Sequence, residues 1–471
     1  MSRNERTNAR THERTVVIGG GIAGLTCAWR LHQAGISITL LEQSSHTGGC
    51  IRTMDEAGYH LELGPNTFLN SSKSLWDLAE SVGLKELKIE TPQKIGKTRY
   101  VFRGEKLHRV PSGPGILFSS VLSVGGRLRI LKEPFIRAKL PFTNALTHQR
   151  TNAPDESLAS FIERRLGKEV LDNLVTPFVS GIYAGDPEKL SVKSVFPKLF
   201  EAEQKYGGIF KGMKALKGEI KSSGLGSFKA GMSTLPAAIE SQLAGRIKKN
   251  SHVTSINKLN NSYAVNYEED GKPKNILADK VVIATPSYVT ADLLGGLDKQ
   301  FQDPLNRIQY APIIVIHVGY RKYDIPRVLD GFGFLVPRKN RVRILGCLWS
   351  SALFEGRAPE GRHILTNFMG GMLDQDAIDL TNEDIMRLVR KDLNRTMNIK
   401  AEPDFACITR YTHAIPQYNL GHERIISKIN GTLALYPGLF LTGSYFTGIS
   451  VAGAIEHAEE TAKKVLGTFH F

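Results

Sequence analysis

Three glycines and one glutamate near the start of the chain have the types and the spacing to bind a charged ligand. Gly19 permits a tight turn, Gly21 lets backbone N–H groups approach a pyrophosphate, and Gly24 lets a helix pack close to a strand. Glu42 follows Gly24 by 18 residues, close to the offset of about 20 expected for an acid that accepts a hydrogen bond from a ribose hydroxyl. Together these residues predict a dinucleotide site.

The elements that must position these residues are indicated by the flanking sequence. Residues 16–18 form a short apolar run typical of a strand buried on both faces, and residues 36–41 form a second run that ends at Glu42. Between the two runs, Leu25, Ala28 and Leu31 follow helical spacing. The N-terminus of this helix supplies partial positive charge for phosphates. The order of strand, glycine turn, helix, strand and acid predicts a Rossmann-like α/β domain.

A second glycine pair narrows the choice of nucleotide. Gly48-Gly49, followed by Arg52-Thr53, resembles the FAD-binding signature of the amine oxidase and phytoene desaturase class of flavoproteins. That class usually has an arginine two residues before the pair, where this chain has His46. The resemblance implies that FAD is the cofactor.

Composition limits the remaining possibilities. The 471 residues are enough for two or three domains, and the chain has no apolar run of about 18 residues that would predict a transmembrane helix. Its four cysteines are scattered and form no CxxC pair, which argues against metal centres and redox disulfides. We therefore predict no metal site and a reducing, cytoplasmic location.

The net charge of +15 calls for a partner or a solvated basic surface. The sequence lacks a helix-turn-helix, an RNA-binding aromatic signature and a zinc finger, so we expect no nucleic-acid partner. Residues 1–14 carry four arginines without an apolar segment, which predicts a disordered basic tail and not a secretory signal.

Residues 111–143 are the segment most suited to a membrane surface. Short apolar patches there lie beside Arg127, Arg129 and Lys132, a pattern typical of a helix that lies on lipid. Ordinary amphipathic helices with one buried face would give the same pattern. A peripheral attachment to the inner face of the membrane is therefore one of two open interpretations.

The pattern along the chain predicts a discontinuous organisation. Residues 280–283 and 439–441 have the apolar composition of further buried strands, and 313–320, 331–337, 343–349 and 364–369 are successive β-like runs. We predict an FAD-binding domain from residues 15–92, 225–300 and 430–471. Residues 93–224 would form a helical domain facing the membrane or the substrate, and residues 301–429 a mixed-sheet substrate domain.

Several longer motifs agree on one family. The chain resembles the protoporphyrinogen oxidases, FAD enzymes of late haem synthesis, along nearly its whole length. The matching segments are GGGIAGL at 19–25, ELGPNTF at 62–68, RYVFRGEKLHRVPSG at 99–113, SGIYAGDPEKLS at 180–191, FPKLFEAEQKYGG at 196–208, GFGFLVP at 331–337, IPQYNLGH at 415–422 and TGSYFTGISV at 442–451. The first and last are shared by many flavoproteins, whereas the middle ones are specific.

The resemblance assigns roles to individual residues. The cofactor-binding set is Gly19, Gly20, Gly21, Ile22, Ala23, Gly24, Glu42, Gln43, Gly49, Cys50, Gly64, Pro65, Asn66, Thr67, Val253, Ser450 and Val451. The substrate-binding set is Arg99, Gly181, Phe332 and Leu335. In this family the arginine pairs with a propionate, and the other three residues line a flat pocket in which Gly331 and Gly333 would leave room for the ring.

The implied chemistry is removal of hydride from a porphyrinogen macrocycle, for which the cofactor supplies the electronics. The protein must then hold a flat apolar disc with a charged anchor at its rim. No acid–base dyad stands out, so we name no catalytic residue. No cysteine follows Cys407, and we expect non-covalent FAD. Dioxygen is the implied acceptor, giving hydrogen peroxide over three two-electron steps, and a quinone stays open. A homodimer and contact with the ferrochelatase step are further candidate partners.

Four alternatives compete with this interpretation. A coproporphyrinogen oxidase of the same fold would act on a substrate with four carboxylates where protoporphyrinogen has two, and the basic segment 94–109 could suit it. An amine oxidase or carotenoid desaturase would share the first and last motifs. A non-catalytic porphyrin carrier would need no flavin that turns over, and a nucleic-acid binder would show salt-sensitive DNA binding.

Overall fold

A five-stranded parallel sheet forms the base of the dinucleotide-binding part. The structure, a computed structural model, describes residues 13–111, 115, 119–139, 155–215 and 224–468. The strand order is β10 (Ile247–Lys248), β2 (Ser37–Leu41), β1 (Arg14–Ile18), β14 (Lys280–Ile283) and β20 (Leu439–Leu441). Because parallel strands end at one edge, the segments that follow β1, β2, β14 and β20 meet there.

Alternate residues of these strands bury into two different cores. Val17 of β1 belongs to a cluster with α2 (Ile22–Gln33), α3 (Lys73–Ser81), α12 (Thr234–Gln242) and α19 (Val451–Gly467). Val16 and Ile18 face a second cluster with α13 (Ser287–Gly295) and the antiparallel sheet β11 (Ser251–Leu259), β12 (Ser262–Glu269) and β13 (Lys272–Ala278). Burial on both faces explains the continuous apolar runs of the strands. The predicted Rossmann-like domain is confirmed.

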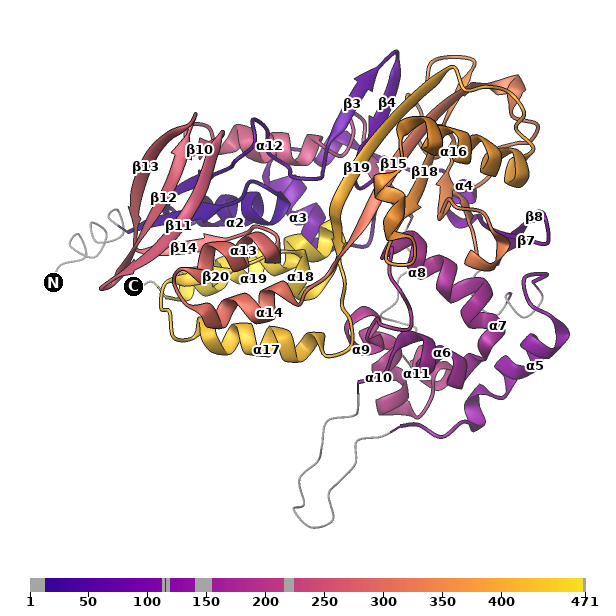
Figure 1. Cartoon of the computed structure of the whole chain (residues 1–471), viewed down its shortest axis with the longest axis horizontal. Helices are drawn as coiled ribbons and strands as arrows, with labels where there is room; N and C mark the ends of the chain where they lie inside the picture. Colours follow the sequence, from indigo (N-terminus) through magenta and orange to yellow (C-terminus); the bar gives the residue numbers. More distant parts are fainter. Residues whose placement is uncertain (1–12, 112–114, 116–118, 140–154, 216–223, 469–471) are drawn as a thin grey trace, which may run out of the picture.

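The second large sheet of the structure is a mixed sheet of seven strands. Its order is β19 (Phe405–Pro416), β15 (Tyr310–Arg321), β18 (Arg362–Gly370), β17 (Gly346–Leu348), β16 (Gly333–Leu335), β7 (Arg99–Arg103) and β8 (Lys106–Val110). Helix α16 (Asn382–Met397) buries Ile385, Val389 and Leu393 against it. Figure 1 shows this sheet beside the parallel one, with α16 across it.

The hairpin β7–β8 departs from the predicted division of the chain. The sequence grouped it with the helices of residues 93–224, but β7 pairs in parallel with β16, with Tyr100 opposite Phe334 and Val101 opposite Leu335. Its backbone hydrogen bonds therefore make it an edge of the substrate-side sheet. The predicted division into three domains otherwise stays a prediction.

The helical region lies below the seven-stranded sheet, where Figure 1 shows it in magenta. It contains α5 (Val124–Leu131), α6 (Leu158–Leu166), α7 (Lys168–Val170), the π-helical turn η4 (Leu171–Val175), α8 (Thr176–Ile182), α9 (Val192–Val195), α10 (Pro197–Tyr206) and α11 (Ile209–Ala215). A fully buried ion pair joins Arg165 Nη2 to Glu133 Oε1 at 2.8 Å, and Arg164 pairs with Glu203 at 2.7 Å. These charges join α6 to its neighbours beside the apolar core of this region, to which Leu158, Phe161 and Ile162 of α6 belong.

Two sequence expectations fall partly outside the described residues. Residues 1–12 of the predicted tail lie outside the described residues. The prediction was wrong for its last two residues, because Arg14 begins β1 and Glu13 pairs with Lys280 at 2.7 Å. Residues 112–114, 116–118 and 140–143 of the predicted membrane-facing segment also lie outside. Among the described helices, none combines the length and apolarity needed to cross a bilayer.

Candidate functional site

The turn after β1 forms an open cradle of backbone N–H groups. Gly19 has a φ of +100°, and its N–H donates to the carbonyl of Leu41 at 2.8 Å. A side chain at position 24 would place its Cβ 1.9 Å from the carbonyl oxygen of Gly19, so only glycine allows α2 to begin here. Gly21 precedes α2, and no side chain caps this helix. Its first N–H groups are therefore available to an anion.

Glu42 is held at the end of β2, facing this cradle. Its carboxylate accepts hydrogen bonds from the N–H groups of Gly20 at 2.6 Å and Ser44 at 2.7 Å. Only 8% of the residue is exposed. Because each carboxylate oxygen has a second lone pair, Glu42 can still accept from a ribose hydroxyl. Sequence and structure thus bring the predicted acid and the glycine turn together.

The residues assigned to the adenine end lie next to Glu42. The N–H of Ser251, the first residue of β11, donates to the carbonyl of Glu42 at 2.8 Å. This contact brings β11 alongside the end of β2, with Val253 buried. The exposed amide oxygen of Gln43 lies 3.3 Å from the ring Nδ1 of His252.

The second glycine pair packs directly on the first glycine turn. The N–H of Gly48 donates to the carbonyl of Gly20 at 2.8 Å, and a Cβ on Gly49 would lie 3.4 Å from the Cα of Gly21. Gly48 and Gly49 both have positive φ, at 97° and 61°. These left-handed conformations explain why two glycines occur in succession.

The segment Gly64 to Thr67 lies against Cys50, the residue that follows the second glycine pair. A Cβ on Gly64 would lie 2.0 Å from the carbonyl oxygen of Cys50, so the two backbones touch. The Asn66 side-chain amide donates to the Gly64 carbonyl at 2.9 Å, and Pro65 and Thr67 are half-buried beside it. The predicted cofactor residues of the first 67 positions therefore form one contiguous surface.

An ion pair behind this segment was not found from the sequence. Arg357 Nη1 lies 2.8 Å from Glu62 Oε1, and both side chains are buried. Glu62 also accepts from the N–H of Met232 at 3.0 Å and from the hydroxyl of Thr53 at 2.8 Å. Nothing local distinguishes Arg357 from the other arginines of the chain, so only the fold reveals its role.

A small cavity of about 10 Å³ is lined by this ion pair together with Asn66 and Thr67. His317 lines it, and its Nδ1 lies 3.0 Å from the hydroxyl of Thr366. Burial lowers the pKa of His317 to about 4, with a partly opposing effect from the backbone of Glu62. The imidazole is therefore neutral near pH 7. The cavity has the size of one water molecule.

The C-terminal loop is braced by a tyrosine that the sequence also left unassigned. The Tyr418 hydroxyl accepts from the N–H of Gly448 at 2.6 Å and donates to the carbonyl of Ser444. The Ser450 hydroxyl in turn accepts from the N–H of Gly453 at 3.0 Å and so caps α19. Val451 packs against the core cluster that contains Ile22 and Ala23 of α2, which places this loop beside the glycine turn.

The four predicted substrate residues form two contacting pairs, which come from β7, α8, β16 and the residue before β16. The guanidinium of Arg99 lies over the ring of Phe332, 5.4 Å from its centroid. A Cβ on Gly181 would lie 2.4 Å from Cδ2 of Leu335, so α8 touches the strand at this glycine. Phe332 and Leu335 are both half-buried. The structure therefore places the arginine of β7 against an aromatic ring just before β16, and a glycine of α8 against a branched apolar side chain of β16.

Close packing of the protein backbone explains why glycine occupies positions 331 and 333. A Cβ on Gly331 would lie 2.9 Å from the carbonyl oxygen of Thr98, and one on Gly333, where φ is +132°, would lie 2.0 Å from that of Cys347. Both glycines are therefore required by close strand packing. The expectation that they leave room for a ring stays a prediction beside this explanation.

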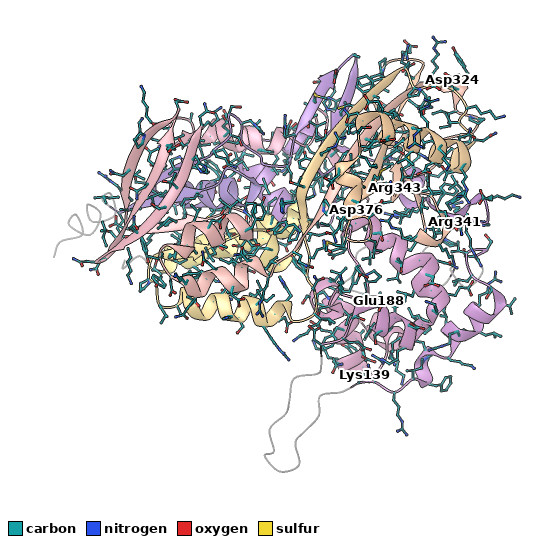
Figure 2. All side chains as sticks on the ribbon, in the orientation of Figure 1. Lys139, Glu188, Asp324, Arg341, Arg343 and Asp376 are labelled. Carbon is teal, nitrogen blue, oxygen red and sulfur yellow. The ribbon has the colours of Figure 1, made fainter. Side chains whose placement is uncertain are left out.

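Two further arginines follow β16, but their charge is shared with acids. Asp374 lies 3.1 Å from Arg343 and 3.8 Å from Arg338. The hydrogen bond to Asp374 raises the pKa of Arg343, and the nearby Asp376 adds to this effect. Figure 2 shows Arg343 and Asp376 close together, with Glu188 on the helical region below. This cluster is thus largely compensated internally.

The fold and the glycine cradle define a flavin-dependent oxidoreductase. The flavin containing amine oxidoreductase family matches residues 22–466, and the chain belongs to this family. FAD is its cofactor, and the uncapped start of α2 and the clash that any side chain at position 24 would cause fit a pyrophosphate at that place.

Within this family, the chain is similar to proteins that are named as porphyrinogen oxidases. The chain is 35% identical to the chloroplastic protoporphyrinogen oxidase of Oryza sativa subsp. japonica, covering 97% of this chain and 89% of the relative. It is 30% identical to the coproporphyrinogen III oxidase of Bacillus subtilis (strain 168), covering 96% and 98%. A crystal structure from Exiguobacterium sp. 255-15 shares the fold with a TM-score of 0.80 at 24% identity, covering 97% and 99%.

Proposed function

We propose that this protein oxidises protoporphyrinogen IX to protoporphyrin IX in haem biosynthesis. The proposal is supported by the family, by relatives named for porphyrinogen oxidation, and by the grouping of Arg99, Phe332, Leu335 and Gly181. FAD, bound non-covalently, supplies the hydride acceptor when present. Dioxygen is the proposed final acceptor, with hydrogen peroxide as the second product.

The chain's own residues would bind and orient a flat substrate. Leu335 and the Phe332 ring offer apolar surface, and the close contact of Gly181 with Leu335 keeps α8 against the strand. The exposed Arg99 guanidinium can pair with a propionate in a charge-assisted hydrogen bond. Correct placement of the macrocycle is the main contribution that such residues can make to the rate.

The ion pairing of the arginines near β16 is the observation that favours protoporphyrinogen over coproporphyrinogen as the substrate. Among the described residues, Arg99 has no carboxylate partner, whereas Arg338 and Arg343 share Asp374. Of these three arginines only Arg99 is uncompensated, which suits a substrate with its two carboxylates at one side better than a substrate with four. The B. subtilis relative keeps coproporphyrinogen III as the second candidate.

The test is a side-by-side fluorescence assay of both porphyrinogens with the FAD-loaded enzyme. We expect faster formation of protoporphyrin than of coproporphyrin. Arg99→Ala should raise KM for protoporphyrinogen about tenfold, as expected for loss of a charged hydrogen bond worth about 1.5 kcal/mol. Arg99→Lys should keep part of the affinity, because it retains the charge but not the bidentate geometry.

Lys106→Ala is the matched control, since Lys106 is an exposed cation at the far end of the same hairpin. It should leave both kinetic constants unchanged. Preference for coproporphyrinogen would move the enzyme to the second candidate function. An Arg99→Ala variant with an unchanged KM would reject the assigned anchor.

We also propose peripheral contact with a membrane through α5 and the turn that follows it. The exposed fractions of Val124, Leu128 and Phe135 are 69%, 57% and 87%, beside Arg127 and Arg129. Apolar side chains flanked by cations favour anionic lipid. Flotation with vesicles containing phosphatidylglycerol should carry the wild type upward but not a Leu128→Asp/Phe135→Asp variant, and equal flotation of both would refute the contact. A homodimer and contact with the ferrochelatase step stay predictions.

A further inference from the structure

A second cavity lies on the other side of the C-terminal loop, between α17 (His422–Leu433) and α19. Its volume is about 220 Å³. Strand β20 and the short helix α18 (Ser444–Thr447) complete its walls, and Figure 1 shows these yellow elements together. The side chains that line it are Ile426, Asn430, Leu433, Phe440, Leu441, Phe446, Thr447, His457, Glu460, Thr461 and Lys464. None of them belongs to the predicted flavin or substrate sets.

The interior of this cavity offers flat, uncharged surface. Phe446 stacks on His457 with ring centroids 4.5 Å apart and an interplanar angle of 11°. Burial lowers the pKa of His457 to about 4, and the charge of Lys464 lowers it further, so the imidazole is neutral near pH 7. With Leu433 and Phe440 opposite, these rings form walls suited to a planar apolar body.

The mouth of the cavity carries polar groups of different kinds. The exposed Lys464 makes no ion pair with any other described residue, and its effect on His457 shows that its charge lies near the cavity. Glu460 lies one helical turn earlier, and the exposed Asn430 comes from the facing helix α17. The mouth thus presents one cation, one hydrogen-bond acceptor and one amide.

We propose that this cavity is a binding site for a small planar carboxylate that also carries one N–H or O–H donor. Lys464 would pair with the carboxylate, Glu460 would accept from the donor, and the ring system would lie between Leu433 and the Phe446–His457 pair. A single cation beside an acid favours a monoanion over a polyanion. The volume is below the roughly 300 Å³ of typical drug-sized pockets, which limits the ligand to about two fused rings.

The site can communicate with the flavin loop through α18. Phe446 and Thr447 line the cavity, and the next residue is Gly448, whose N–H is held by Tyr418. A ligand that fixes Phe446 would therefore also restrict the start of the loop that leads to Ser450. This consequence depends on the proposed flavin role of that loop, whereas binding itself does not.

The experiment uses the FAD-loaded protein and 6-hydroxy-2-naphthoate, a fluorescent planar carboxylate with two fused rings and one O–H donor. We expect a saturable rise in its fluorescence. Indole-3-acetate, a planar carboxylate with an N–H donor, should displace it, whereas tryptamine, with an ammonium in place of the carboxylate, should not. Lys464→Gln should weaken probe binding about fivefold, the upper range for an exposed ion pair.

Two matched pairs of variants assign the signal to this cavity. Lys463→Gln removes the adjacent exposed charge outside the lining and should bind like the wild type. Asn430→Trp, at an exposed position of the mouth, should abolish the saturable component, whereas Ser427→Trp, one turn earlier on the same helix, should not. Equal binding by wild type, Lys464→Gln and Asn430→Trp would overturn the proposal, even if porphyrinogen turnover is normal in all three.

Discussion

Glu62 and Arg357, 295 residues apart in the chain, form a buried ion pair at 2.8 Å directly behind the predicted flavin-contacting segment. Arg357 Nη2 also donates to the hydroxyl of Ser227 at 3.0 Å. The pair joins β4 (Tyr59–Glu62) to the loop before β18 and to β9 (Leu225–Phe228). It thereby connects the segment that begins at Gly64 to β9 and to the loop that precedes β18 of the seven-stranded sheet.

Removing the arginine should destabilise the protein strongly. Arg357→Met leaves Glu62 buried without its counter-ion, which typically costs about 3–5 kcal/mol. The double variant Glu62→Gln/Arg357→Met should recover part of that loss, because the unpaired charge is gone. Urea unfolding of the FAD-loaded protein measures both.

The control is Lys85→Met, which breaks the exposed pair of Lys85 with Glu80 at 2.7 Å. This change should leave the unfolding midpoint nearly unchanged, since exposed pairs contribute little. If Arg357→Met were as mild as Lys85→Met, the ion pair would not be what anchors the segment.

Two glycines of the first turn should respond differently to the same added methyl group. Gly24→Ala places a Cβ 1.9 Å from the carbonyl oxygen of Gly19, so it should prevent normal packing of α2 and reduce soluble yield. At Gly21 a Cβ would meet no protein atom within 4 Å, and φ is −67°. Gly21→Ala should therefore fold but lose FAD, because the methyl group occupies the approach to the pyrophosphate.

The ratio of absorbance at 450 nm and 280 nm, together with far-ultraviolet circular dichroism, separates these effects. Gly296→Ala is a suitable control, since that position is open and has negative φ. Full flavin content in folded Gly21→Ala would show that the cofactor phosphates lie elsewhere.

The contact between Gly181 and Leu335 predicts a substrate-specific defect. In Gly181→Ala the new methyl group would meet Cδ2 of Leu335 at 2.4 Å, and this flexible end must turn away. Because Leu335 is proposed to line the substrate site, KM should rise about threefold to tenfold while FAD content is kept. Gly181→Ala/Leu335→Val should recover much of the affinity, because the shorter side chain removes the conflict. A double variant no better than the single one would argue against this contact as the cause.

The parts of the fold set by local pattern were predictable. The order of strand, glycine turn, helix, strand and acid over residues 16–42 was expected from apolar spacing, and β1, α2 and β2 confirm it. The pairing of the β7–β8 hairpin with β16 was not expected, since that contact spans more than 200 residues. Arg357 and Tyr418 were missed for the same reason: their partners are chosen by tertiary packing. The substrate set came from resemblance, and its binding roles stay predictions.

The buried histidine behind Asn66 should make stability depend on pH. The pKa of His317 is lowered from 6.5 to about 4 in the folded protein, so the unfolded chain binds the proton more readily between these values. Stability is therefore fully present above pH 6.5 and is lost as pH falls toward 4. For one such group the free energy of unfolding at pH 5 is about 2 kcal/mol lower than at pH 7, because one pKa unit corresponds to about 1.4 kcal/mol.

His317→Gln should remove that share of the pH dependence while an amide can still hydrogen-bond to Thr366. His422 and His457 also have pKa values lowered to about 4 by burial, so the variant should reduce the slope and not abolish it. Urea unfolding at pH 7 and pH 5, with FAD in excess, measures the difference. An identical drop in wild type and variant would mean that His317 is already protonated in the folded state, or that water reaches it freely.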